Sequence, residues 1–200
     1  MIRLLGRKTS GNVQKVVWLL EELGLAYARE DYGRQFGNTG DAAYLALNPN
    51  GKVPTLIDGD LAIWESNTIL RYLSAKAGSP LLPGDPGART LVERWMDWQL
   101  AAINPLYMTI FKESRKPEGE RAPDLAAHGE ALGAQLAILD DAMAGRAWVA
   151  HDAMSVADFC LGPIVHRCLG FPVALPALEN VRRWHGAIAA RPGFIAATGG

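Results

Sequence analysis

The spacing of apolar residues changes near residue 80, and this change restricts the possible folds more than any other feature of the chain. Before it, short apolar stretches typical of strands alternate with helical patterns, whereas beyond residue 88 only helical spacing occurs. We therefore expect an α/β domain followed by an all-helical domain. The stretch 80–87 is rich in Pro and Gly and is typical of a linker, so the predicted domains are 1–79 and 88–200.

The first domain is predicted to contain a small mixed sheet covered by helices, with the element order β-α-β-α-β-β-α. Gly24 marks the end of its first helix, and Asp58-Gly59 is a strong signal for the turn of a hairpin. The predicted elements, in chain order, are 2–6, 10–25, 26–32, 41–48, the hairpin 53–64, and 65–78.

The second domain is predicted to be helical throughout. Its first pattern is interrupted at Asn104-Pro105, where a kink or a break is expected because proline cannot donate a backbone hydrogen bond. Ser155 and Asp158 have the S-x-x-D spacing of a capping box at the start of a later helix. The predicted helices are 88–113, 124–145, 155–170 and 177–194.

Pro54 stands in the segment NPNGKVPTL, among residues whose alternation favours a strand. Proline cannot donate to a sheet ladder, so it marks an edge, a bulge or the start of a strand. Two arrangements fit this pattern. A cis Val53–Pro54 bond would turn the chain sharply and leave the backbone groups of Val53 able to pair with an extended peptide. A trans proline would simply begin an edge strand.

Glu65 and Ser66 fall at the first turn of a predicted helix, in the segment WESNTIL. The backbone N–H of Ser66, its hydroxyl and the helix dipole together favour a bound carboxylate. Glu65 could receive an ammonium group, so that the pair would recognise both charges of an α-amino acid. Ordinary capping by Ser66, with Glu65 favourable to the helix dipole, explains the same residues.

The segment RKTSGN joins the first predicted strand to its helix, and it carries Thr9, Ser10 and Asn12. The first backbone N–H groups of a helix have no partner within the helix, and they attract negative charge. A hydroxyl at this position can donate to a thiolate and lower the pKa of a thiol from its usual value of about 8.5. An N-cap without chemistry is the alternative.

Composition argues against several classes of protein. The net charge of −1 and the lack of a basic run disfavour nucleic-acid binding. The two cysteines, Cys160 and Cys168, are expected to be buried thiols, and the four histidines show no metal-binding spacing. No apolar stretch reaches the roughly 18 residues that span a bilayer, and no signal peptide is evident, so a cytoplasmic location without membrane partners is expected.

The three segments around Ser10, Pro54 and Glu65 all belong to one small predicted sheet and its helices. Together they match a single ligand that has a thiol, a peptide backbone and an amino-acid head group. The chain resembles the cytosolic glutathione S-transferase superfamily over almost its whole length, and in particular its bacterial serine-type (theta-, delta- or nu-like) members. The segments that carry this resemblance are NPNGKVPTL, ESNTILRYL and MSVADFCLG. The resemblance implies the glutathione transferase fold, in which a thioredoxin-like N-terminal domain precedes an all-helical C-terminal domain.

The same resemblance implies glutathione as the co-substrate, with no metal. Val53 would hydrogen-bond to the cysteinyl backbone of glutathione, with Pro54 in the cis form. Glu65 and Ser66 would hold the γ-glutamyl end. Lys52 would pair with the glycine carboxylate, or would remain a solvated loop residue.

For the thiol, the resemblance places Ser10 where the serine-type classes carry their catalytic hydroxyl. Asn12 falls where some bacterial classes use an asparagine, and Thr9 competes with Ser10 because one step in the register exchanges them. Neither a tyrosine nor a cysteine occurs in GRKTSGN, which departs from the tyrosine and cysteine classes of the family. This departure argues against reductase chemistry through a protein cysteine.

In the resembled fold, the long helix of the second domain faces the first domain, and its side chains either line an apolar pocket for an electrophile or pack in the core. The candidates are Trp98, Tyr107, Met108 and Phe111. We therefore expect a homodimeric glutathione transferase that conjugates glutathione to hydrophobic electrophiles. The alternatives are a glutathione-dependent reductase of disulfides or peroxides, and a non-catalytic binding module with the same fold.

Overall fold

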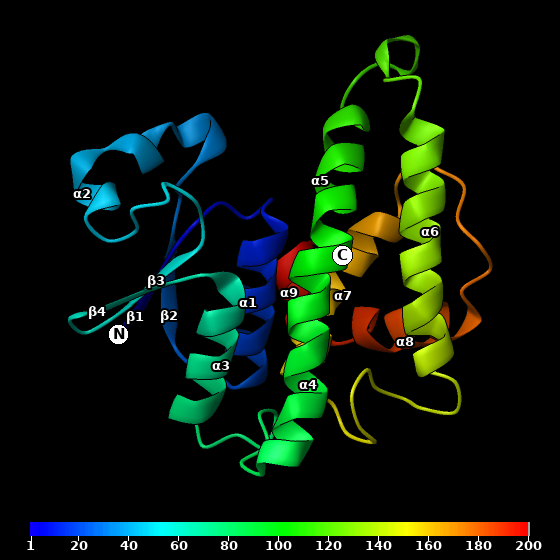
Figure 1. Ribbon diagram of the computed structural model, residues 1–200. Helices are drawn as coiled ribbons and strands as arrows, with labels where there is room; N and C mark the ends of the chain where they lie inside the picture. Colours follow the sequence, from blue (N-terminus) through cyan, green and yellow to red (C-terminus); the bar gives the residue numbers. More distant parts are fainter. Residues whose placement is uncertain (200) are drawn as a thin grey trace. The chain divides into compact units, whose positions relative to one another are not determined.

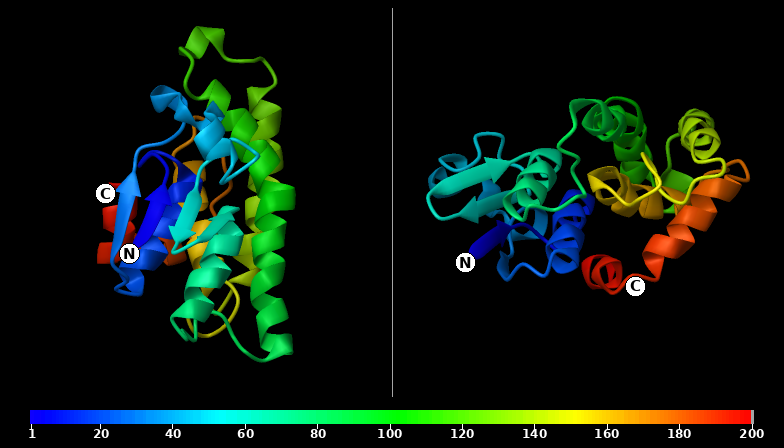
Figure 2. Two further views of the ribbon diagram at one scale, coloured as in Figure 1. Left: turned by 90° about the vertical axis from the view of Figure 1, so that its left-hand side faces the viewer. Right: turned by 90° about the horizontal axis from the view of Figure 1, so that it is seen from below.

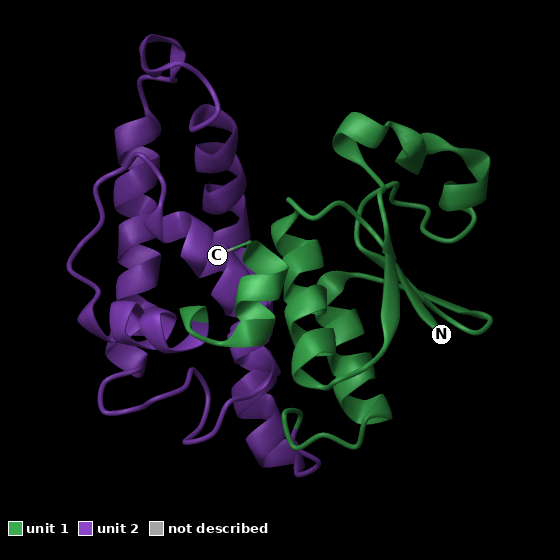
Figure 3. Cartoon of the chain, turned by 180° about the vertical axis from the view of Figure 1, so that it is seen from behind, with its two compact units in different colours: residues 1–82, 189–200 green, residues 83–188 purple. Residues whose placement is uncertain are grey.

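The computed structural model describes residues 1–199, which form two compact units (Figure 3). The first comprises Met1–Leu82 together with the chain end from Ala189, and the second comprises Pro83–Ile188. The first unit is a mixed α/β domain and the second is helical (Figure 1), so the fold class expected from the sequence is confirmed.

Within the described residues, the strands of the first unit form one four-stranded sheet in the order β2-β1-β3-β4, seen side by side in Figure 2, left. The strands are β1 (Ile2–Leu5), β2 (Tyr27–Glu30), β3 (Thr55–Asp58) and β4 (Leu61–Trp64). β1 runs parallel to β2 and antiparallel to β3, and β3 and β4 form the predicted hairpin. The mixed sheet and its predicted element order are therefore confirmed.

Helices α1 (Gly11–Glu22) and α3 (Ser66–Lys76) lie side by side on one face of this sheet (Figure 1). α1 ends where the sequence predicts, at Gly24, whose φ of +62° is the left-handed conformation that favours glycine. Its N–H donates to Glu21 O and the following N–H donates to Leu20 O, which is a Schellman motif. The short helix α2 (Ala42–Leu45) lies in the connection between β2 and β3.

The last helix, α9 (Pro192–Thr198), packs against α1 within the first unit. Phe194 meets the ring of Trp18 edge-on, with the ring centroids 5.0 Å apart, and Arg191 forms an ion pair with Glu22. The single helix predicted over 177–194 is wrong. Proline at position 192 favours an extended residue before it and can only begin a helix, so α8 (Glu179–Ala189) ends and α9 starts anew.

The second unit is built from α4 (Pro86–Trp98), α5 (Asn104–Glu113), α6 (Leu125–Ala142), α7 (Val156–Leu169) and most of α8. A π-helical turn, Gln99–Ile103, joins α4 to α5 next to the interruption expected at Pro105. Because Pro105 has no N–H for the carbonyl four residues earlier, the wider turn absorbs the mismatch without ending the helical path.

At the start of α7, the predicted capping box is present. The backbone N–H of Ser155 donates to Asp158 Oδ2 at 2.8 Å. Cys160 and Cys168, on the same helix, are buried free thiols, as expected.

Candidate active site

A pocket in the first unit is lined by residues from separate segments of the chain, and it holds about 310 Å³ of empty space, part of it open to solvent. The segments are the start of α1, the loop before β3 and the start of α3. The lining residues are Asn12, Asn48, Asn50, Lys52, Val53, Pro54, Glu65 and Ser66. The structure therefore brings the five residues predicted to bind glutathione around one pocket, together with Asn12.

The Val53–Pro54 peptide bond is cis, which is the first of the two arrangements considered for this segment. Val53 precedes β3 and is not part of the sheet. Among residues 1–199, no group hydrogen-bonds to its backbone N–H or C=O. Both groups therefore remain available at the wall of the pocket, where an extended peptide can pair with them.

A buried network of side chains holds the loop that carries Val53. Asn48 Nδ2 donates to Lys52 O at 2.8 Å and to Thr55 Oγ1 at 3.0 Å, so one amide bridges the two sides of the Val53–Pro54 turn. Tyr44 Oη donates to the same Lys52 carbonyl at 2.6 Å and lies 2.9 Å from Thr55 Oγ1. Since the single proton of Tyr44 is used by Lys52, Thr55 donates to Tyr44 and accepts from Asn48. Burial raises the pKa of Tyr44, which keeps its hydroxyl in the donor form.

Asn48 is only 2% exposed, and each of its polar atoms has a partner, because its Oδ1 accepts from the backbone N–H of Asn50 at 3.1 Å. A buried network that is fully satisfied makes a loop rigid. The sequence indicated only a turn at Asn-Pro-Asn-Gly, and neither Asn48 nor Asn50 was among the predicted site residues. No local spacing indicates that the Asn48 side chain reaches Thr55.

Glu65 and Ser66 lie at the start of α3. Glu65 has φ +68° and ψ 113°, a conformation that is strained for a residue with a Cβ and that is found mainly at functional sites. Neither side chain makes a capping hydrogen bond, so the alternative of capping by Ser66 is wrong, while a favourable effect of Glu65 on the helix dipole stays a prediction. Ser66 is 3% exposed, lines the pocket, and its hydroxyl makes no hydrogen bond within residues 1–199. The hydroxyl and the N-terminus of α3 can therefore act together on an anionic group.

The three candidates for the thiol lie at the start of α1 but differ in their surroundings. Ser10 is the N-cap residue, is 7% exposed, and makes no side-chain capping bond. Thr9 is exposed. Asn12 lines the pocket, and its Oδ1 is buried without a hydrogen-bond partner among the described residues. Such orphaned atoms are rare in folded proteins, and a ligand in the pocket would supply the partner.

The four candidates for an electrophile pocket belong to the second unit. Tyr107 and Phe111 stack almost in parallel, with centroids 5.7 Å apart and an interplanar angle of 8°. Trp98 instead meets Trp95 edge-on, at 5.2 Å. Met108 is 40% exposed. The structure thus joins Tyr107 and Phe111 into one aromatic surface and places Trp98 in a different aromatic pair.

Among residues 1–199, no three His, Cys, Asp or Glu side chains come together in a way that could hold a metal ion. His166 and His185 form a hydrogen-bonded pair, Nδ1 to Nε2, at 2.9 Å.

None of the helices in the described part of the chain is both long and apolar enough to cross a membrane.

Two family models match the sequence. The model described as "Glutathione S-transferase, N-terminal domain" matches residues 2–75, and the model described as "Glutathione S-transferase, C-terminal domain" matches residues 102–192. Among curated relatives, glutathione S-transferase GstB of Escherichia coli K12 is 38% identical over 197 residues, which cover 96% of this chain and 95% of the relative. Glutathione S-transferase 3 of Zea mays is 32% identical over 203 residues, which cover 96% of this chain and 91% of that relative.

Solved structures give the same picture. The theta class glutathione S-transferase from Xanthomonas axonopodis pv. citri, with glutathione bound, superimposes with a TM-score of 0.94 at 37% identity, covering 98% of this chain and 96% of that one. A glutathione transferase from Pseudomonas putida, with one glutathione disulfide bound per subunit, has a TM-score of 0.87 at 25% identity. The match covers 98% of this chain and 90% of that one.

Proposed function

Because this chain belongs to the glutathione S-transferase family, we propose that it conjugates the thiolate of glutathione to hydrophobic electrophiles and that the pocket of the first unit is its glutathione site. One observation carries the proposal for the site. The available backbone of Val53, the start of α3 and Asn12 converge on a single pocket. These groups have the chemistry that a tripeptide with two carboxylates, an ammonium and a thiol requires.

Each part of glutathione has a proposed partner in this pocket. The backbone of Val53 lies outside the strands and would hydrogen-bond to the cysteinyl backbone of glutathione, as an added strand does. Ser66 and the N-terminus of α3 would hold the γ-glutamyl carboxylate, while Glu65 receives the ammonium. The exposed Lys52 would pair with the glycine carboxylate.

The chemistry begins when the thiol of bound glutathione loses its proton to solvent. A donor at the start of α1, proposed to be Ser10 with Asn12 or Thr9 as competitors, stabilises the thiolate together with the helix dipole. The amide of Asn12 serves as a donor when its NH₂ group faces the sulfur. The thiolate then attacks the electrophilic carbon, a C–S bond forms, and the leaving group departs with its bonding electrons. Proximity and charge stabilisation supply the rate enhancement.

The partner substrate and the assembly are part of the proposal. Trp98, Tyr107, Met108 and Phe111 are proposed to line the electrophile pocket. A homodimer is proposed from the family resemblance, and light scattering of the purified chain measures it. The cytoplasmic location expected from the sequence stays a prediction.

A second candidate activity is glutathione-dependent reduction of disulfides, favoured by one observation. The Pseudomonas putida relative was solved with glutathione disulfide bound. In this reaction the glutathione thiolate attacks one sulfur of the disulfide and releases the other as a thiolate, so glutathione itself supplies the nucleophile and no protein cysteine is needed.

Substitution of Ser66 tests the glutathione site. Ser66→Ala removes a hydroxyl proposed to bond to a carboxylate, and such bonds contribute about 1.5–3 kcal/mol, so we expect the Kd for glutathione to rise about 10- to 100-fold. Isothermal titration calorimetry measures this change. Thr68→Ala removes a hydroxyl from an exposed position two residues further along α3, and is the matched control. Wild-type affinity in the Ser66 variant would refute the assignment of the head-group site.

An activity panel tests the reaction itself. Glutathione is supplied with an aryl halide, an organic peroxide and a low-molecular-weight disulfide in separate assays. Turnover of the aryl halide is the expected result, whereas turnover of the disulfide or peroxide alone would favour a reductase. Retention on immobilised glutathione without any turnover would identify a binding module.

A further inference from the structure

An aromatic surface in the second unit carries two guanidinium groups, and we propose that it selects electrophiles that combine an aromatic ring with a negatively charged group. The proposal rests on the proposed transferase function and names the class of its second substrate. We call this surface the basic aromatic surface. It consists of Tyr107, Phe111, Arg115, Arg167 and Phe171.

Three rings form the floor of the basic aromatic surface. Phe111 stacks on Tyr107, and Phe171 lies 5.6 Å from Tyr107 on another side, at an interplanar angle of 43°. Tyr107 and Phe171 are buried, whereas Phe111 is half-buried. An incoming aromatic ring would therefore contact Phe111 and the exposed Met108 beside it in α5, both of which keep accessible surface.

Two cations from distant parts of the sequence converge on the Phe111 ring. The guanidinium of Arg167, on α7, lies 5.3 Å from the ring centroid, and that of Arg115, just after α5, lies 5.9 Å from it. Arg167 Nη1 also donates to Tyr107 Oη at 3.0 Å. This bond and the ring contact orient the Arg167 guanidinium before any ligand arrives, which reduces the entropic cost of binding.

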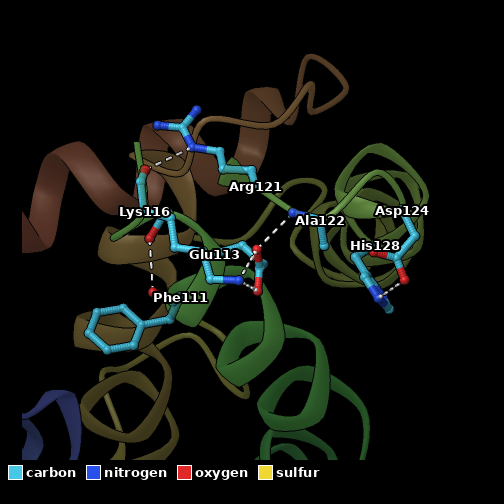
Figure 4. A network of polar contacts seen from close by, with 8 residues as sticks. Phe111, Glu113, Lys116, Arg121, Ala122, Asp124 and His128 are labelled. Atoms are coloured by element: carbon cyan, nitrogen blue, oxygen red, sulfur yellow. Dashed lines mark hydrogen bonds and ion pairs between the residues drawn. The ribbon is translucent and has the colours of Figure 1, made fainter. Parts of the chain in front are cut away.

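The acid closest in sequence, Glu113, does not neutralise this surface. Its carboxylate accepts from Lys116 Nζ at 2.7 Å and from the backbone N–H of Ala122 at 2.8 Å, so it is committed to the turn between α5 and α6. Figure 4 shows this network with the Phe111 ring pointing away from the Glu113 carboxylate. Within residues 1–199, Arg115 forms no ion pair. Arg115 therefore keeps its positive charge beside the half-buried Phe111 ring.

The chemistry of these groups favours an acidic aromatic substrate. A carboxylate matches the two parallel N–H donors of a guanidinium, and the bond is stronger beside a buried apolar surface than in open water. A neutral electrophile gains only the ring contact. The simpler explanation is that Arg167 stabilises the last turn of α7 through the helix dipole, which predicts lower stability on substitution but no change in substrate preference.

A pair of matched substrates distinguishes these explanations. The acid 4-chloro-3,5-dinitrobenzoate and its methyl ester react with glutathione in the same way, through formation of a C–S bond and loss of chloride, but only the acid carries a negative charge. We expect Arg167→Met to lower the acid-to-ester ratio of kcat/KM about 10-fold, because one charge-assisted bond to the acid is lost. Arg115→Met should lower this ratio less, because among the described residues the Arg115 guanidinium is not held by a hydrogen bond as that of Arg167 is. Arg167→Lys should restore part of the ratio.

Arg94→Met is the control. Arg94 is exposed on α4 of the same unit and lies over the ring of Trp95 at 5.8 Å, so its substitution removes the same charge and the same kind of ring contact elsewhere. Its acid-to-ester ratio should equal that of the wild type. The proposal is overturned if Arg167→Met and Arg115→Met leave the ratio unchanged or lower both substrates equally. Failure of the wild type to bind glutathione or to use either substrate would instead contradict the proposed function.

Discussion

Ser10 and Asn12 are separated by one residue, yet only Asn12 lines the pocket. Ser10→Ala should raise the pKa of the bound glutathione thiol by about 1–2 units, because a donor to the thiolate is lost, with little change in Kd. The rise in pKa would move the pH dependence of conjugation to higher pH. Ultraviolet titration of the thiolate measures the shift. If Asn12→Ala raises the pKa of the bound thiol and Ser10→Ala does not, Asn12 is the residue that stabilises the thiolate.

We expect Asn48 to control the binding of glutathione without contacting it. Asn48→Ala removes the bridge from Lys52 to Thr55, so the backbone of Val53 loses its fixed position. We expect the KM for glutathione to rise about 10-fold with a much smaller change in kcat, since the loss of one or two hydrogen bonds weakens positioning. Steady-state kinetics measure both constants.

Asn50→Ala is the matched control for this prediction. Asn50 lines the same pocket, but its side chain bonds only to Asn48, at 3.2 Å, among the described residues. It should therefore change KM less than Asn48→Ala. An equal change would mean that direct contact, rather than the buried network, controls the affinity.

At the scale of a single element, α7 depends on the buried carboxylate of Asp158. This group accepts from the backbone N–H of Ser155 at 2.8 Å, from that of Val149 at 3.1 Å and from Trp184 Nε1 at 2.9 Å. Burial raises the pKa of Asp158 from 3.8 to about 6 in spite of these donors. The folded state therefore binds the proton more tightly than the unfolded chain does.

The raised pKa of Asp158 makes the stability of the protein depend on pH. The stabilisation from proton binding at Asp158 is fully present below about pH 4 and is lost as the pH rises through about 6. Its size is about 2–3 kcal/mol. As the pH rises from 4 to 6.5, the free energy of unfolding of the wild type should therefore fall relative to that of the Asp158→Asn variant. Urea denaturation at each pH measures both values. Parallel curves for wild type and Asp158→Asn would contradict the raised pKa.

At the scale of the whole molecule, the chain end completes the first unit. Phe194 is 1% exposed and packs on Trp18, so Phe194→Ala should lower the free energy of unfolding by about 3–5 kcal/mol through the cavity that it leaves. Ile195, its neighbour, is 45% exposed, and Ile195→Ala should cost much less. Denaturation followed by circular dichroism compares the two. Equal losses would mean that α9 contributes through its helical content alone.

The sequence correctly predicted features that depend on residues close to one another in the chain. Gly24 ends α1, Asp58-Gly59 turns the hairpin, and the pair Ser155 and Asp158 caps α7. Each of these features lowers the energy of one backbone segment, whatever the rest of the molecule does. The change from mixed to helical periodicity was informative for the same reason, because each element must bury its own apolar face.

Contacts between distant positions required the folded chain. The local residues left both forms of the Val53–Pro54 bond open, and only the family resemblance implied the cis form. Nothing in the sequence indicated that Asn48 bridges that turn, that Arg167 lies on Phe111, or that Phe194 returns to Trp18. Partners that are many residues apart are chosen by packing and by the need to satisfy buried polar groups, and neither condition has a fixed spacing in the sequence. For that reason the types of residue around the pocket were predictable, while the groups that hold the pocket in place were not.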